Sequence, residues 1–571
     1  MKIARVSFIL VLIAGLALSA AAGRLVFAAP PPVPSLNGDT LSDLIIGVPN
    51  ETYASGMILE PEAGALNVIY SAAGGLAGMG SQLWNQGGPA VEGNPETGDH
   101  FGWAVVSGDF NGDDHADLAA GNPDEDVNVW TDAGTVNVLY GSVSGVQTTN
   151  QRDFHQNRTG VDGAPEDGEG YGSSLAVGDF NGDGYDDLAI GIPRNTRGDI
   201  TGVVSDTEAV GAVNVIYGSA SGLDPVGAPD QLWYQGGSLT GTAEENDSFG
   251  ASLAAGDFNG DGVDDLAVGI PGDTAGAVPG AGGVQIIFGA GGAGLTASGN
   301  QVWNLDSTDV EGDPAPGDQF GASLAVGDFN ADGLEDLAVG IPGYAYDGVE
   351  DSGAVTVLYS DGGSLTGAGS QLFAQGAGGV QGTSEPGEQF GYSLAVGDFN
   401  WDGYVDLAVG APYDHEAGIA GGAVYVVHGS GTGLDGAGSQ VWHQGDALTG
   451  LEGEAGDGDA FGFSLASGDF DDDGYADLAV GVPYEEVGAF TDAGAVNVIY
   501  GALGGLSATG NQLWHQDSPD IAGVAADNEH FGHSLAASGL RVQDVPSTPP
   551  TEPPPGGSGG EVFLPLLHTS P

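Results

Sequence analysis

Six short stretches of the chain share one arrangement of oxygen-bearing side chains, Asp-x-Asn/Asp-x-Asp-x-x-x-Asp. They begin at Asp109, Asp179, Asp257, Asp328, Asp398 and Asp469. Four such side chains crowded into a Gly-bent loop repel one another unless a cation lies between them, and Ca²⁺ prefers oxygen ligands in flexible loops. The pattern therefore predicts about six Ca²⁺ sites with a structural role.

Within each loop, positions one, three, five and nine offer side-chain oxygens, and position seven offers its backbone carbonyl. The predicted metal ligands are Asp109, Asn111, Asp113, His115 and Asp117; Asp179, Asn181, Asp183, Tyr185 and Asp187; Asp257, Asn259, Asp261, Val263 and Asp265; Asp328, Asn330, Asp332, Leu334 and Asp336; Asp398, Asn400, Asp402, Tyr404 and Asp406; and Asp469, Asp471, Asp473, Tyr475 and Asp477. In the last loop Asp471 replaces the usual Asn, which adds charge that tightens the expected site.

An EF-hand is the main competing interpretation of these loops. It requires a bidentate Glu at position twelve and flanking helices, whereas position twelve of the second loop is Ile190 and both flanks have strand character. The EF-hand interpretation therefore fails, and metal-free Asp/Asn-rich hairpin turns remain as the alternative. A degenerate seventh loop contains Asn37, Asp39 and Asp43, but Ser35 replaces its first Asp, so we expect weak or no metal binding there.

The loops belong to a longer repeat. Successive loops start 70 to 78 residues apart, and a period of this kind indicates a repeat architecture. Each loop follows an aromatic-Gly pair and precedes an apolar run that ends in Gly-x-Pro, such as residues 266–271. Apolar runs of period two, bounded by Gly, Asn, Asp and Pro, indicate four short strands per unit. Such units predict the four-stranded antiparallel blades of a β-propeller.

The two ends of the repeat region complement each other. The first aromatic-Gly strand follows strands of the other three types, at residues 43–49, 65–71 and 82–86, and the last one, residues 531–539, has no successors. We therefore expect the C-terminal strand to complete the N-terminal blade. The result is an all-β, seven-bladed ring without an open sheet edge at the seam.

These residues carry a family resemblance. Phe-Gly followed by Gly-Ala-Pro around an acidic loop, as in residues 390–412, resembles the FG-GAP repeat of integrin α-subunits and related bacterial surface proteins. The resemblance covers residues 36–540. It implies a seven-bladed propeller whose calcium loops join the first and second strands of a blade, with partners bound on the face opposite the calcium. The integrin adhesion domain with its Asp-x-Ser-x-Ser metal site has no counterpart here, so the resemblance does not extend to integrin ligand specificity.

The chain ends outside this region have a different character. Lys2 and Arg5 precede an apolar stretch, residues 6–22, as in a secretory leader, which we place at residues 1–29; a membrane anchor is the competing interpretation. Residues 541–571 form a Pro/Gly-rich segment with a short apolar end, which predicts a disordered tail. We expect a secreted protein, extracellular or at the cell surface, whose mature chain is not inserted in a membrane.

Charge narrows the range of partners. The formal net charge is −71, with 8 Lys and Arg against 79 Asp and Glu. Such a surface repels phosphate backbones and anionic lipids, so we expect no nucleic-acid partner. Cysteine is absent, so bound calcium must take over the stabilising role that disulfides play in many exported proteins.

The sequence shows no catalytic constellation, because its histidines are scattered and it has neither HExxH nor G-x-S-x-G. The leading prediction is a monomeric, non-enzymatic adhesion or ligand-binding module for a protein or glycan partner. A carbohydrate-active enzyme resembling polysaccharide lyases and a structural envelope protein are the alternatives. Arg197, Gly198 and Asp199 spell the tripeptide that integrins recognise, which we interpret as a chance match.

Overall fold

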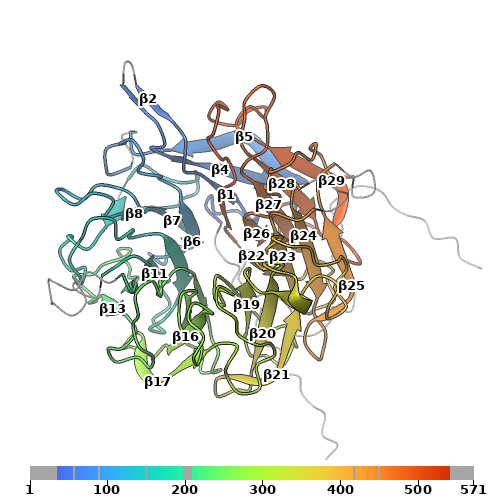
Figure 1. Ribbon diagram of the computed structural model, residues 1–571. Coiled ribbons are helices and arrows are strands. Elements are labelled where there is room, and N and C mark those ends of the chain that lie inside the picture. Colours follow the sequence, from blue (N-terminus) through green and yellow to red (C-terminus); the bar gives the residue numbers. More distant parts are fainter. Residues whose placement is uncertain are drawn as a thin grey trace, which may run out of the picture. The chain divides into compact units, whose positions relative to one another are not determined.

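The computed structural model describes residues 35–55, 58–87, 91–149, 151–196, 209–415, 420–445 and 450–539. In this part of the chain, seven four-stranded antiparallel sheets form the blades of a β-propeller (Figure 1). Fold class and blade number are therefore as the sequence predicts. The predicted leader, the predicted tail and the tripeptide at Arg197 lie outside the described residues.

Each blade is given from its inner to its outer strand. Blade 1 consists of β30 (Ser534–Ala537), β1 (Leu44–Val48), β4 (Ala65–Ala72) and β5 (Gly75–Trp84). Blade 2 consists of β6 (Ala104–Gly108), β7 (Asp117–Asn122), β8 (Thr135–Leu139) and β9 (Arg152–Phe154). Blade 3 consists of β10 (Ser174–Gly178), β11 (Asp187–Ile192), β12 (Ala212–Ile216) and β13 (Gln231–Trp233). Blade 4 consists of β14 (Leu253–Gly256), β15 (Asp265–Ile270), β16 (Gly283–Phe288) and β17 (Thr296–Trp303).

The remaining blades follow the same order. Blade 5 consists of β18 (Ser323–Gly327), β19 (Asp336–Ile341), β20 (Ala354–Ser360) and β21 (Leu365–Phe373). Blade 6 consists of β22 (Ser393–Gly397), β23 (Asp406–Ala411), β24 (Ala423–His428) and β25 (Asp435–Trp442). Blade 7 consists of β26 (Leu465–Gly468), β27 (Asp477–Val482), β28 (Ala495–Tyr500) and β29 (Ser507–Trp514). Outside the blades, the described residues form a small hairpin, β2 (Tyr53–Ser55) with β3 (Ile58–Glu60), and a 3-10 turn at Tyr346–Gly348.

The hydrophobic core lies between neighbouring blades. The second strand of every blade is fully buried, and the third strand is almost so, since both faces meet an adjacent sheet. Apolar side chains at successive positions are what a strand enclosed on both faces requires. The Phe at the second position of each acidic loop, such as Phe110 or Phe180, is completely buried and packs with residues of the next blade.

The Phe-Gly and Gly-x-Pro motifs meet where two blades touch. Gly172, after the aromatic residue, has φ of +91°, a value that favours glycine. A Cβ on Gly121, in the Gly-x-Pro motif of blade 2, would lie 2.0 Å from the carbonyl oxygen of Gly172 in blade 3. The same approach recurs between Gly269 and Gly321. Both glycines are therefore needed for the blades to approach this closely.

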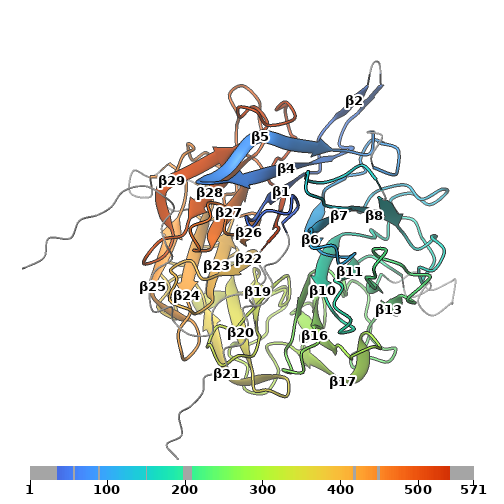
Figure 2. The same cartoon turned by 180° about the vertical axis from the view of Figure 1, so that it is seen from behind.

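The C-terminal strand closes the ring, as predicted. β30 pairs antiparallel with β1, and Leu44 lies opposite Ala537. β30 also contacts β6 of blade 2 and β26 of blade 7, so the seven inner strands form an unbroken circle. Figure 2 shows the ring of blades from the other side. The seam is stabilised by a hydrogen bond of 2.9 Å from Ser107 Oγ to the carbonyl of Ala537.

A tyrosine and a glutamine connect most neighbouring blades. Tyr217 at the end of the third strand donates to Gln231 Oε1 on the fourth strand, and Gln231 Nε2 donates to the carbonyl of Leu295 in the next blade, at 3.2 Å. The backbone N–H of Leu295 donates to the Tyr217 hydroxyl. Six blades use Gln for this contact, namely Gln82, Gln231, Gln301, Gln371, Gln440 and Gln512. Blade 2 uses Arg152 instead.

Antiparallel order places the connections of each blade at two ends of the ring. The end with the loops between first and second strands also carries the loops between third and fourth strands, and we call it the acidic-loop face. The other end carries the remaining connections and is called the opposite face.

Candidate metal centres and ligand-binding face

The first Asp of each acidic loop organises the turn. Asp109 Oδ1 accepts hydrogen bonds from the N–H groups of Gly112 and Asp113, at 2.7 and 3.1 Å, and Oδ2 accepts one from Asp114 at 3.0 Å. The corresponding first residues accept in the same way, namely Asp179, Asp257, Asp328, Asp398 and Asp469. The carbonyl ligand expected at position seven remains a prediction.

The ninth residue brings a carboxylate into the interior at the start of the second strand. Asp187 has no exposed surface and accepts hydrogen bonds from the N–H groups of Phe180 and Gly218, at 3.0 and 2.7 Å. Burial, and then the charges of Asp179 and Asp183, raise the pKa of Asp187 to about 8 despite these bonds. The pKa values of Asp117, Asp265 and Asp336 are raised to about 8 in the same way, by burial first. A divalent cation would remove this conflict.

In two loops the third residue supplies an oxygen that lacks a partner. The Oδ1 atoms of Asn181 and Asn400 are buried, and neither has a hydrogen-bond partner among the described residues. In the last loop, ligand atoms of Asp469, Asp471 and Asp477 lie within 4.8 Å of one another. Buried oxygens without donors and converging carboxylates form the all-oxygen donor set of Ca²⁺. The residues present therefore fit this cation.

Two loops depart from the common pattern. His428 Nδ1 lies 3.3 Å from Asp406 Oδ2 in blade 6, and this contact raises the pKa of His428. His428 was not predicted from the sequence, although it stands where most blades have Tyr. In the degenerate loop, Ser35 Oγ donates to Asp39 Oδ1 at 3.1 Å, so a hydroxyl organises the turn in place of the missing carboxylate.

The opposite face carries a connected set of aromatic rings near the inner strands. In four consecutive blades the residue directly after the Phe-Gly pair has a ring. These residues are Tyr392 in blade 6, Phe463 in blade 7, His533 in blade 1 and Trp103 in blade 2. Their ring centroids are 5.1 Å apart from Tyr392 to Phe463, 5.1 Å from Phe463 to His533 and 4.6 Å from His533 to Trp103. We call these four rings the aromatic arc.

Further rings and acids surround the aromatic arc. Tyr413 lies beside Tyr392, with centroids 6.3 Å apart, and Tyr484 lies 6.0 Å from Phe463. His100 next to Trp103 contacts Asp124 at 2.8 Å. Burial, followed by two neighbouring histidines, lowers the pKa of His533 to about 4, so its ring is neutral at physiological pH. Blades 3, 4 and 5 place only Ser173, Ala251 and Ala322 at this position, so the arc occupies one side of the ring.

Beneath this surface the opposite face buries a second set of acids, two residues before each Phe-Gly pair. These acids are Asp99, Glu169, Asp247, Asp318, Glu388, Asp459 and Glu529. Several of them face a second acid from the loop after the second strand. Burial, and then repulsion by Asp459, raise the pKa of Glu485 to about 8. Asp99 lies beside Glu125, and the pKa of Asp99 is also raised to about 8, mainly by burial. Around Glu388, ligand atoms of Glu385 and His415 converge within 4.8 Å.

The FG-GAP repeat family matches the chain at residues 101–139, 171–207, 249–287, 320–358, 390–427 and 461–499. Human integrin alpha-7 is 44% identical over 165 residues, which are 28% of this chain and 12% of that protein. Integrin alpha-PS2 of Drosophila melanogaster is 32% identical over 274 residues, 46% of this chain and 17% of that protein. The chain thus spans less than a fifth of these relatives. It is an FG-GAP repeat protein with an integrin-α-like propeller.

Solved structures resemble the fold at low identity. The periplasmic gluconolactonase PpgL of Pseudomonas aeruginosa is 13% identical with a TM-score of 0.39, covering 87% of this chain and 99% of that structure. The exotype rhamnogalacturonan lyase YesX is 12% identical with a TM-score of 0.36, and the match covers 88% of this chain and 83% of that structure. Within the described part of this chain, no helix is long and apolar enough to cross a bilayer.

Proposed function

We propose that this protein is an exported, calcium-stabilised and non-enzymatic ligand-binding module that receives a protein partner on the opposite face. The aromatic arc is the observation that carries the proposal. Trp103 at one end of the arc and Tyr413, which lies beside Tyr392 at the other end, are each 38% exposed. Exposed aromatic rings bordered by polar groups are typical of interaction sites.

The chemistry of this face favours a basic side chain of the partner. The faces of Trp and Tyr rings attract guanidinium and ammonium groups. Carboxylates reinforce that attraction, since Asp124 contacts His100 and Asp492 and Glu62 act on His530 beside Tyr484. The net charge of −71 adds long-range steering of a cationic partner.

The six acidic loops hold Ca²⁺ in this proposal. The side chains at positions one, three, five and nine bind the cation, which when bound compensates the charge of the buried ninth Asp. The loops lie at the other end of the blades from the aromatic arc, so their role is to stabilise the blades rather than to contact the partner.

A peptide titration tests the proposed face. The double variant Trp103→Ala/Tyr413→Ala is compared with Leu503→Ala, which alters a residue 88% exposed on the acidic-loop face. The probe is a short glycine-flanked arginine peptide, with its neutral citrulline analogue as ligand control, titrated by calorimetry in calcium at physiological ionic strength. We expect binding about tenfold weaker for the double variant and unchanged for Leu503→Ala. Equal affinity of the double variant, or of the citrulline peptide, would contradict the proposal.

A further inference from the structure

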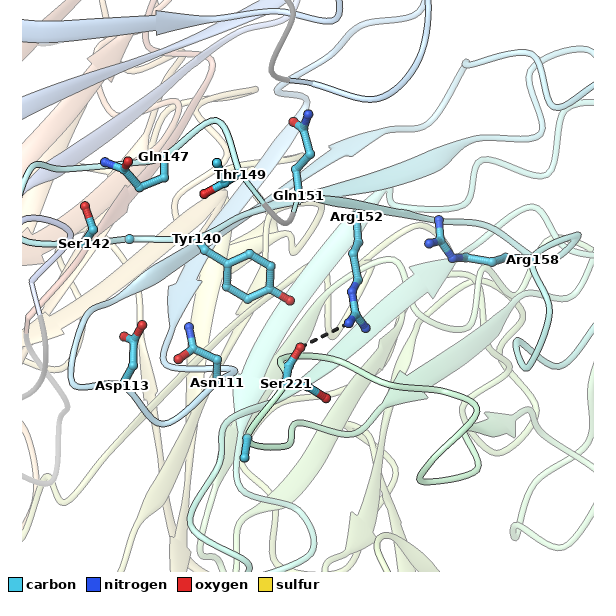
Figure 3. Close-up of a pocket in the computed structure, with 12 residues that line it drawn as sticks. Asn111, Asp113, Tyr140, Ser142, Gln147, Thr149, Gln151, Arg152, Arg158 and Ser221 are labelled. Carbon is cyan, nitrogen blue, oxygen red and sulfur yellow. Dashed lines mark hydrogen bonds between the residues drawn. The ribbon is translucent and has the colours of Figure 1, made fainter.

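A cavity of about 800 Å³ opens on the acidic-loop face between blades 2 and 3 (Figure 3). Most of its lining comes from blade 2, and Ser221 of blade 3 borders it. Ser142, Gln147 and Thr149 contribute hydroxyl and amide groups. Arg152 and Arg158 also line it, although the whole chain has only 8 Lys and Arg. The cavity therefore gathers two of the few basic side chains of the chain together with neutral polar groups.

Arg152 is the residue that breaks the repeat. It occupies the position that holds Gln in the other six blades, and it keeps the structural contact of that Gln by donating to the carbonyl of Leu223. A second N–H group donates to the carbonyl of Ser221 at 3.1 Å. Among the described residues no carboxylate pairs with Arg152, whereas Arg158 forms an ion pair with Asp153. A guanidinium has five N–H donors, so Arg152 retains donors and an uncompensated charge.

Tyr140 has lost its usual acceptor through the same substitution. The hydroxyls of Tyr70, Tyr217, Tyr359 and Tyr500 each donate to the Gln of their own blade. Arg152 cannot accept a hydrogen bond, and the buried hydroxyl of Tyr140 has no acceptor for its proton among the described residues. Tyr140 is only 8% exposed, and its hydroxyl points into the cavity toward Arg152 (Figure 3). An unsatisfied buried hydroxyl carries a free-energy cost that a bound acceptor would remove.

We propose that this cavity binds the carboxylate of an acidic sugar. The guanidinium of Arg152 supplies the charge-assisted hydrogen bonds that suit a planar carboxylate, and the Tyr140 hydroxyl donates to an oxygen of the same ligand. The ring hydroxyls of the sugar meet Ser142, Gln147 and Thr149. This lining favours a saccharide over an acidic peptide side chain, because its hydroxyl and amide groups can pair with ring hydroxyls, which a peptide carboxylate side chain lacks.

The proposed site is distinct from the aromatic arc, since it lies on the other face. It adjoins the first acidic loop, because Asn111 and Asp113 also line the cavity. The carboxylate of Asp113 would repel an anionic sugar when the loop charge is not compensated. Binding is therefore measured in saturating calcium.

Arg152→Gln is the decisive variant because it restores the residue of the other six blades. It keeps a donor for the Leu223 carbonyl and gives Tyr140 an acceptor, so the melting temperature should be unchanged or higher. Arg194→Gln is the matched control: it removes the same charge from an exposed arginine on the opposite face, paired with Asp124 at 3.0 Å. Tyr140→Phe removes only the hydroxyl.

Glucuronate, methyl glucoside and N-acetylglutamate are titrated into each protein by ligand-observed NMR. We expect wild type and Arg194→Gln to bind glucuronate with similar affinity. Arg152→Gln should bind glucuronate at least about tenfold more weakly, and Tyr140→Phe several-fold more weakly. Methyl glucoside should not bind to any of the four proteins. Unchanged binding by Arg152→Gln would overturn the proposal, as would failure of wild type to bind glucuronate. Equal affinity for N-acetylglutamate would also overturn it, because the ligand would then be a carboxylate of a peptide.

Discussion

The acidic-loop face and the opposite face both bury a carboxylate in every blade, but they assemble their acids in different ways. On the acidic-loop face the interacting groups come from nine consecutive residues, as from Asp179 to Asp187. On the opposite face an acid before the Phe-Gly pair meets one from a later loop, as Asp99 meets Glu125. The first arrangement is local in sequence, whereas the second exists only once the blade has folded.

The two arrangements also differ in how their charge is neutralised. In the last acidic loop three carboxylates converge within 4.8 Å, and in two other loops the Oδ1 atoms of Asn181 and Asn400 have no hydrogen-bond partner among the described residues, which suits a cation. The acids of the opposite face instead occur in pairs with nearby donors: Gln86 Nε2 donates to Glu125 Oε2 at 2.6 Å, and the N–H of Glu96 donates to Asp99. Pairs of buried carboxyls of raised pKa are neutralised by protons. Calcium should therefore govern one face and pH the other.

Calcium removal should have the largest effect. Each site at a free calcium concentration about a hundred times its Kd adds roughly 2.7 kcal/mol to the free energy of unfolding, and six such loops together would rival the total stability of an ordinary domain, about 5–15 kcal/mol. We expect a chelator to lower the melting temperature by well over 10 °C, since about 1 kcal/mol corresponds to roughly 2–4 °C in a larger domain. Calorimetry with and without chelator measures this shift in melting temperature, and an unchanged transition would refute calcium stabilisation.

The pH dependence should come second, and it should persist in saturating calcium. The pKa of Glu485 is about 8 in the folded protein against a reference value of 4.5, so the folded state holds a proton that the unfolded state has lost. The stability from this protonated carboxyl is complete below pH 4.5 and is lost as pH rises through about 8. Denaturant midpoints at pH 5, 7 and 9 should fall progressively.

The variant Glu485→Gln isolates this effect. It keeps the shape of the side chain without a titrating proton. The free energy of unfolding should therefore fall less steeply with rising pH, by up to about 1.4 kcal/mol per pH unit. Glu350→Gln, at an exposed position on the opposite face, is the control and should follow wild type. Identical slopes for all three proteins would show that Glu485 does not titrate in this range.

A single loop variant should have a smaller effect than either change of conditions. Asp187→Asn removes the buried carboxylate of one loop, so we expect one fewer bound calcium and a melting temperature lower by several degrees in a chain that still folds. Asp361→Asn, at an exposed residue on the same face, should change neither quantity. Metal analysis of the dialysed proteins gives the stoichiometry, and an equal calcium content in both variants would exclude Asp187 as a ligand.

The smallest effect should come from Ser35→Asp, which places a carboxylate at the first position of the degenerate loop. Asn37, Asp39 and Asp43 are already in place there, and the buried Asp43 has a pKa raised to about 7, chiefly by burial. We expect one additional bound calcium and a slightly higher melting temperature. Unchanged stoichiometry would mean that the first Asp is not sufficient to create a site.

The sequence predicted those features that depend on local spacing. Blades, acidic loops and ring closure followed from repeats within short stretches, and even the closure required only counting strands of each type. The fourth strand was less predictable: β5 begins at Gly75 rather than at residue 82, because its Gly-rich first half gains strand geometry only by pairing with β4 across a bulge.

Features that depend on contacts between distant residues were not predicted. Asp99 and Glu125 are ordinary acids in a chain with 79, and only burial makes them a pair. The aromatic arc was also missed, although Trp103, Tyr392, Phe463 and His533 each follow a Phe-Gly or equivalent pair and could have been aligned. Arg152 in place of Gln becomes meaningful once the Tyr–Gln contact between blades is seen.

The pairing of β30 with β1 has a consequence for the order of folding. Leu44 cannot meet Ala537 until nearly the whole chain has been made, so a growing chain carries a first blade that lacks its innermost strand. The entropic penalty for joining such distant residues rises only slowly with length, by about 0.6 kcal/mol per doubling. Until that last step, however, β1 offers an unpaired edge to other incomplete copies, so the chain benefits from staying unfolded until β30 has been made.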